Sequence, residues 1–95
     1  MVRSVNVRIP QVINPEEALR CYYLFTEIGN KEIRAMFGNL GSPRISKMKK
    51  LVRDVMSEEG VLVYDATAVN TEIAFQVWGI NVKKLEKYLR RTENG

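Results

Sequence analysis

Cationic side chains at helical spacing are the residues of this 95-residue sequence with the clearest capacity for chemistry. Segment 42–57 has the periodicity of a helix, and a rotation of 100° per residue places Ser46, Lys47 and Lys50 opposite its apolar stripe. Lysine and arginine side chains on such a face can bind phosphates and the acceptor atoms of guanine in the major groove of DNA. The side chains expected to contact DNA from this helix are Ser42, Arg44, Ser46, Lys47, Lys49, Lys50 and Arg53.

A second basic segment lies near the end of the chain. Residues 82–91 are predicted to form a helix whose outward side chains are Lys83, Lys84, Lys87 and Arg91. The formal net charge of +4 is unevenly distributed, with +5 over residues 31–57, −4 over 58–80 and +3 over 81–95. Lysines are also common on solvated helix faces, so the expectation of DNA contact depends on the turn that precedes each basic helix.

Other kinds of site find little support in the composition. The sequence has no histidine and one cysteine, which removes histidine-based acid–base catalysis, a Cys/His zinc site and a disulfide. Residues 46–49 match the Ser-x-x-Lys pattern of serine acyl-transfer enzymes, but neither a Lys-Thr-Gly nor a Ser-Asp-Asn segment follows. Cys21 lies on an apolar helix face and is expected to be a buried, inert thiol. We expect no enzyme activity, no cofactor and no metal.

Capping residues and apolar periodicity predict the elements that position the basic side chains. Asn14 and Pro15 form a helix start, and Gly60 is suited to end the longest helix. The predicted helices are 15–28, 31–37, 42–57, 71–78 and 82–91, and the predicted strands are 4–9 and 61–64. These elements predict a mainly α fold, a bundle of about five helices with a minor two-stranded β element, in a single domain spanning residues 1–95.

The two basic segments also share an internal pattern. A shift of forty residues lays 30–50 over 70–90 and makes four positions identical: Asn30 with Asn70, Glu32 with Glu72, Ile33 with Ile73 and Lys47 with Lys87. Each copy is a short helix, a turn and a longer basic helix. This order predicts two helix-turn-helix-like units, at 30–57 and 70–91, in which the first helix braces the second.

The second unit carries a resemblance to a known group of folds. Residues 70–74, Gly79-Ile80-Asn81, Leu85 and Leu89 resemble the bacterial helix-turn-helix superfamily, as in LuxR-type output domains and the promoter-binding domains of sigma factors. The likeness covers about a quarter of the chain, and Trp78 stands where the family usually has glycine, so the turn is one residue longer. The resemblance implies sequence-specific binding to double-stranded DNA by a small cytoplasmic transcriptional regulator, working as a homodimer.

Two other readings of the sequence remain open. Residues 4–10 followed by a helix resemble ribbon-helix-helix repressors, although those proteins usually have two helices after the ribbon. The helical bundle could instead be a protein-interaction module or adaptor that uses exposed aromatic side chains, with Trp78, Tyr22 and Tyr64 as candidates.

The loop 38–41 has the spacing of the GxxG loop of KH domains but no basic residue between its glycines, which argues against RNA binding. No apolar run is long enough to cross a membrane.

Overall fold

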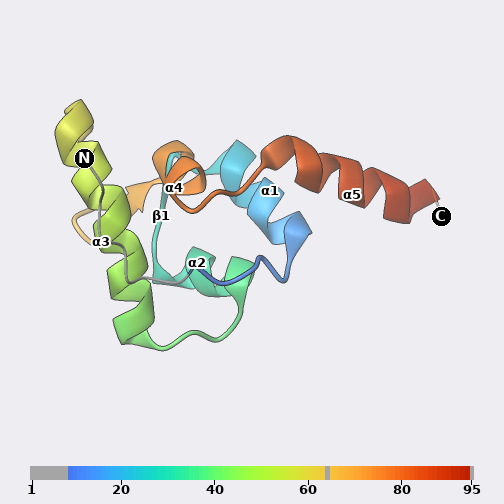
Figure 1. The fold of residues 1–95 in the computed structure, drawn as a ribbon, viewed down its shortest axis with the longest axis horizontal. Coiled ribbons are helices and arrows are strands. Elements are labelled where there is room, and N and C mark those ends of the chain that lie inside the picture. The colour runs from blue at the N-terminus through green and yellow to red at the C-terminus, as the bar shows by residue number, and fades with distance from the viewer. Residues whose placement is uncertain (1–8, 64, 95) are drawn as a thin grey trace.

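A computed structural model describes residues 9–63 and 65–94, which form five helices and two short strands (Figure 1). In chain order these are α1 (Pro15–Leu24), β1 (Glu27–Ile28), α2 (Asn30–Phe37), α3 (Ser42–Glu59), β2 (Val69–Asn70), α4 (Thr71–Val77) and α5 (Val82–Asn94). The expectation of a mainly helical bundle with a small two-stranded element is therefore confirmed.

The two strands lie at positions that the sequence did not predict. β1 and β2 pair antiparallel, with Glu27 opposite Asn70 and Ile28 opposite Val69. Of the predicted strand 4–9, residues 4–8 lie outside the described residues. The predicted strand 61–64 is wrong for residues 61–63, which are irregular, and its last residue lies outside the described part of the chain. The apolar run that suggested this strand has another role, because Val61 and Val63 pack against the core, while Leu62 is 90% exposed.

Helix ends follow the capping residues, with two corrections. The side chain of Asn14 accepts a first-turn N–H of α1 as expected, and Gly60 ends α3 in the left-handed conformation with φ 71°. The predicted helix 15–28 ends early, at Leu24, because the chain turns to an extended conformation to form β1. The sequence favours Asn30 as the cap of a helix over 31–37, but the cap of α2 is Gly29, whose backbone N–H donates to the Glu32 carboxylate at 2.7 Å.

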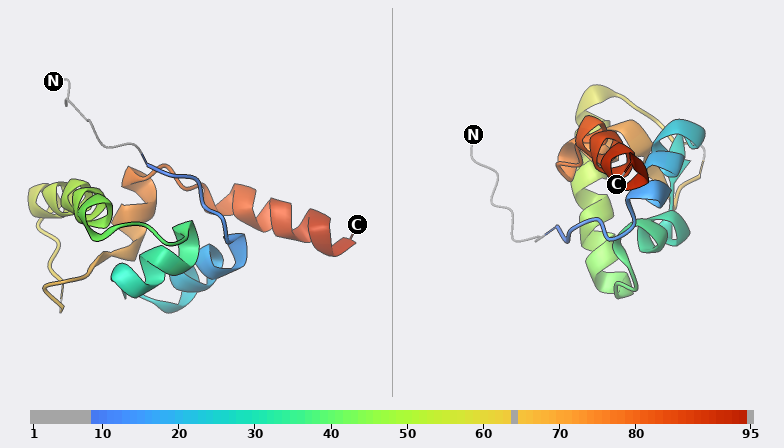
Figure 2. Two further views of the ribbon diagram at one scale, coloured as in Figure 1. Left: turned by 90° about the horizontal axis from the view of Figure 1, so that it is seen from below. Right: turned by 90° about the vertical axis from the view of Figure 1, so that its right-hand side faces the viewer.

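The helices pack as two helix–strand–helix units that the paired strands join. α1 packs on α2 in the first unit and α3 on α4 in the second. α5 packs on α1 and extends away from the rest of the molecule, as Figures 1 and 2 show. Turns do join the helices of the predicted units 30–57 and 70–91, but α4 and α5 hardly touch each other. In the described residues, α4 therefore does not brace α5 as a helix-turn-helix pair would.

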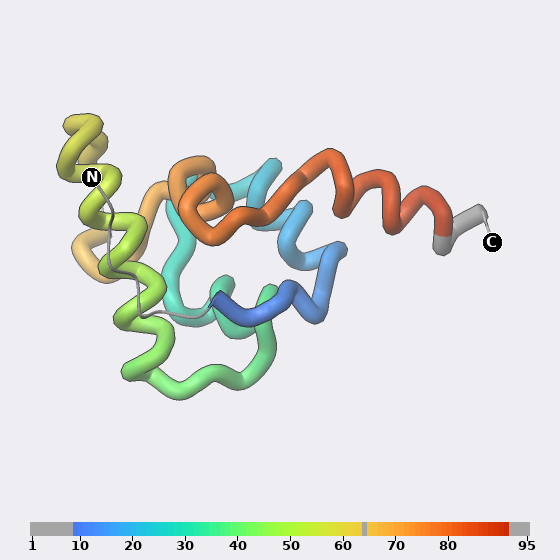
Figure 3. Tube along the Cα trace, in the orientation of Figure 1, coloured from blue at the N-terminus to red at the C-terminus, as the bar shows by residue number. Residues whose placement is uncertain are grey.

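Residues that are 41 positions apart face each other where the two units meet. Ile28 pairs with Val69 in the strands, and the rings of Phe37 and Trp78 make an edge-to-face contact with centroids 5.7 Å apart. Figure 3 follows the Cα trace of the chain through the two units. The offset of forty found in the sequence fits the starts of α3 and α5, whereas the short helices before them start 41 residues apart.

The core is apolar and includes the single cysteine. Cys21 is 1% exposed, which confirms the expectation of a buried thiol. The pKa of the Cys21 thiol is raised to about 11, chiefly by burial and also by the nearby carboxylates of Glu17 and Glu32, while Arg20 opposes the rise. The thiol is thus neutral and unreactive at physiological pH. None of the described helices combines the length and the apolar character needed to cross a bilayer.

Candidate interaction surface

The predicted DNA-contacting residues of α3 do not form one free basic face. Ser42, Arg44, Ser46, Lys47, Lys50 and Arg53 are exposed, whereas Lys49 is buried. Lys50 forms an exposed ion pair with Asp54, with 3.2 Å between Nζ and Oδ1. The hydroxyl of Ser42 accepts a hydrogen bond from Arg34. Exposed contacts of this kind are weak, so a ligand could displace them.

Lys49 and Arg53 instead hold the loop that follows α3. Lys49 is 7% exposed, and its Nζ donates to the carbonyl oxygen of Thr67 at 2.8 Å. The Arg53 guanidinium donates to the carbonyl oxygen of Ala66 at 2.7 Å. We call Lys49 and Arg53 the cation clamp. The expectation that Lys49 contacts DNA from this helix is wrong because its side chain is buried and bound to Thr67, a neighbour that helical periodicity could not reveal.

Hydrogen bonds between residues of the loop also stabilise its conformation. The Asp65 carboxylate accepts hydrogen bonds from the backbone N–H and the hydroxyl of Thr67, at 2.8 and 2.7 Å. These two bonds lower the pKa of Asp65. Burial and the neighbouring charge of Arg53 lower the pKa of Lys49. In the described parts of the chain, no group of three or more His, Cys, Asp or Glu side chains is placed to hold a metal ion.

Removing the buried half of the cation clamp should loosen this loop. We expect Lys49→Met to lower the free energy of unfolding by about 1 kcal/mol. The variant loses the charged hydrogen bond to Thr67 O, and this loss is larger than the gain from no longer burying a charge. The amide of Ala68, which donates to Asp65 O at 3.0 Å, should then exchange faster with solvent. Urea denaturation and hydrogen exchange measure the two effects. Lys50→Met is the control, and equal changes in both variants would contradict a special role for Lys49.

The predicted cations of α5 are all exposed. Lys83, Lys84, Lys87 and Arg91 lie at the surface, and so does Arg90. No ion pair joins any of these five cations to an acidic side chain of the described residues. These charges therefore lie on a helix that extends from the body of the molecule (Figure 1).

An apolar groove borders this basic helix, and sequence reasoning missed it. The groove has a volume of about 430 Å³ and lies between the segment before α1 and α5, lined by Val12, Ile13, Pro15, Lys84, Leu85 and Tyr88. Ile13 is 67% exposed and Tyr88 is 55% exposed, although helical periodicity predicts Tyr88 to be buried. We call these six residues the α5 groove. The sequence offered no signal for the groove, because it depends on where residues 9–14 lie in space.

Backbone contacts fix the N-terminal wall of the α5 groove. The N–H groups of Ile13 and Asn14 both donate to the carbonyl oxygen of Met36, at 2.9 and 3.2 Å. Gly38, with φ 99°, makes room for the Ile13 side chain, whose Cδ1 would lie only 3.0 Å from a Cβ at that position. The Ile13 side chain is therefore held in place while most of its surface faces solvent.

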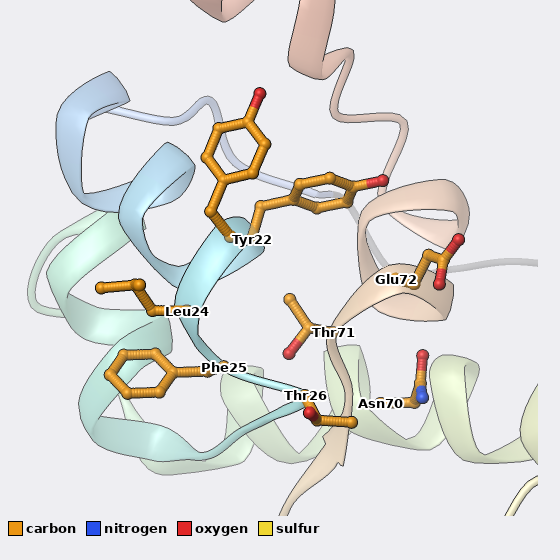
Figure 4. Close-up of a pocket in the computed structure, with 8 residues that line it drawn as sticks. Tyr22, Leu24, Phe25, Thr26, Asn70, Thr71 and Glu72 are labelled. Carbon is orange, nitrogen blue, oxygen red and sulfur yellow. The ribbon is translucent and has the colours of Figure 1, made fainter.

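A second hollow, of about 280 Å³, lies where the end of α1 meets the start of α4 (Figure 4). Tyr22 and Phe25 lie on one side of it, Asn70 and Glu72 on the other, and Thr71 between them. The backbone N–H of Thr71 donates to Thr26 O at 2.9 Å, and the Asn70 side chain caps α4. These polar groups join the two units, so we interpret this hollow as a packing seam.

The aromatic residues expected to bind a partner are not the ones that the structure exposes. Trp78 is 6% exposed, so the expectation that it is an exposed anchor is wrong. Tyr22 is half-buried against Phe75, with ring centroids 5.1 Å apart, and Tyr64 lies outside the described residues. Among the described residues, the exposed aromatic side chains are Tyr88 and Tyr23. The hydroxyl of Tyr23 donates to the Glu86 carboxylate on α5, and this bond raises the pKa of Tyr23.

Comparisons with known proteins give no relative to guide the interpretation. No family model matches the chain, and neither a curated protein nor a solved structure is significantly similar to it.

Proposed function

We propose that this protein is a small protein-interaction module that holds its partner in the α5 groove. The observation that carries the proposal is the exposure of Ile13 and Tyr88 on either side of this groove. Large apolar side chains that line a concave surface are typical of sites where a protein partner removes them from water. Some of the α3 side chains predicted to contact DNA bind other parts of this protein instead. The cation clamp binds two loop carbonyls, and Lys50 forms an ion pair with Asp54.

The order of helices and strands does not by itself fix a function. The α5 groove lies where α5 meets the start of the first unit, because its lining includes Pro15 of α1 as well as Val12 and Ile13.

Binding to duplex DNA through α5 is the second candidate function. The five exposed cations between Lys83 and Arg91 favour it, because such a helix attracts phosphates. The two candidates differ in their dependence on salt. Several phosphate contacts give a steep loss of affinity as salt rises, whereas an apolar interface changes little.

Site-specific photo-cross-linking tests the proposed function. We expect p-benzoylphenylalanine in place of Tyr88 to give discrete protein adducts in an extract of the cells that make this protein, and the same group in place of Lys47 to give none. The adducts should survive nuclease treatment and disappear when Ile13→Ser is added, because Ile13 lines the same groove. Equal adducts from positions 88 and 47, or adducts that nuclease removes, would contradict the proposal.

A further inference from the structure

The α5 groove has a charged edge as well as an apolar floor. Lys84 lines the groove together with Leu85 and Tyr88. Arg91 lies two turns further along α5, on the same stripe of the helix as Lys84 and about 10 Å from it along the axis. Lys87 flanks this stripe on the side away from the groove. Lys84 thus lies at one edge of the groove and Arg91 continues the same stripe beyond its lining residues, and neither forms an ion pair with an acidic side chain of the described residues.

We infer that the occupant of the α5 groove is an acidic amphipathic helix of a partner protein. This inference rests on the proposed function and names the chemistry of the partner. Apolar side chains of the partner would cover Ile13, Leu85 and Tyr88, while carboxylates along one edge of its helix would face Lys84 and Arg91. Carboxylates seven positions apart on a helix repeat at the same spacing of about 10 Å. Shape and charge therefore select the same kind of ligand.

An extended peptide fits this surface less well than a helix. One common way for an extended peptide to bind is to add a strand to a free sheet edge, through main-chain hydrogen bonds. The walls of the α5 groove are a helix and the segment at Ile13 and Asn14, whose N–H groups already donate to Met36 O. The groove therefore offers side chains rather than backbone groups, which is the surface that an amphipathic helix recognises.

A designed peptide pair provides the direct test. The probe is a 15-residue helix of Leu, Glu and Ala with leucines at i, i+3, i+4 and i+7 and glutamates along one edge, and the control peptide has lysine in place of every glutamate. We expect the acidic peptide to bind and to shift the amide NMR signals of Ile13, Leu85 and Tyr88. The basic peptide should bind at least about tenfold more weakly. Equal binding of both peptides, or shifts confined to other surfaces, would overturn the inference.

Matched variants separate the groove from general attraction to charge. Lys84→Glu with Arg91→Glu should weaken binding of the acidic peptide at least about tenfold, because both changes put like charges opposite its carboxylates. Lys83→Glu with Arg90→Glu makes the same change of net charge on the other flank of α5 and should have a much smaller effect. Tyr88→Ser should weaken binding, whereas Leu62→Ser, at a residue 90% exposed elsewhere, should not. Equal losses within either matched pair of variants would contradict the inference.

The remaining outcomes identify other occupants. If a 20-base-pair DNA duplex binds α5 and the acidic peptide does not, the inference is wrong and the second candidate function is favoured. If the protein self-associates and Ile13→Ser abolishes this in sedimentation experiments, the occupant is a second copy, which also overturns the inference. If position 88 gives the expected protein adducts and the acidic peptide does not bind, the interaction module stands while the acidic-helix partner is wrong.

Discussion

Trp78→Ala is expected to lower the free energy of unfolding by about 3–5 kcal/mol, which is a large part of the stability of a domain of this size. Trp78 is 6% exposed and closes the core where the second unit meets the first. Its ring contacts Phe37 edge-to-face, and its indole N–H donates to the carbonyl oxygen of Met48 at 3.1 Å. Alanine would remove both contacts and leave a cavity that the helices cannot fill.

Trp78→Phe separates the two contributions. Phenylalanine retains an aromatic ring beside Phe37 but has no N–H to donate to Met48 O, so we expect a smaller loss of about 1–2 kcal/mol. Urea denaturation followed by far-UV circular dichroism measures both variants, because this signal does not depend on the tryptophan. A loss below about 1 kcal/mol for Trp78→Ala would show that the indole does not anchor the core.

The helices could be predicted from the sequence because their signals are local. Asn14 and Asn70 cap helices through their own side chains, and Gly60 ends one through its own backbone. β1 and β2 are only two residues long, which is too short for a period of two to be visible. They exist because Ile28 and Val69 meet across the fold, and contacts between distant segments leave no local pattern.

The contrast between local signals and contacts of distant segments also explains which residues of the candidate site could be predicted. Periodicity placed the cations of α5 on its outer face correctly, because little of the described molecule covers that face. It failed for Lys49, because the loop containing Ala66 and Thr67 returns over that side of α3. It failed for Tyr88 in the opposite direction, because packing against α1 covers less of α5 than an apolar stripe suggests. A helical pattern thus shows which residues share a face, and the tertiary fold decides what covers that face.

The paired strands lead to a prediction about how the molecule unfolds. Ile28 and Val69 are both fully buried, lie opposite each other in the two strands and belong to different units. We expect Ile28→Ala to lower the free energy of unfolding by about 2–4 kcal/mol, because it leaves a cavity in the core that both units share. The double variant with Val69→Ala should show a coupling energy of about 0.5 kcal/mol or more, as contacting residues do.

Ile28→Ala in the first unit should also destabilise the second. Trp78 belongs to the second unit, so its fluorescence reports on that unit, while far-UV circular dichroism reports on all helices. If the strands make the two units one cooperative structure, both signals in Ile28→Ala should shift to the same lower urea midpoint. A fluorescence midpoint that stays at the parent value while the circular dichroism midpoint falls would show that the second unit folds independently. Leu62→Ala, at an exposed position, should leave both midpoints near those of the parent.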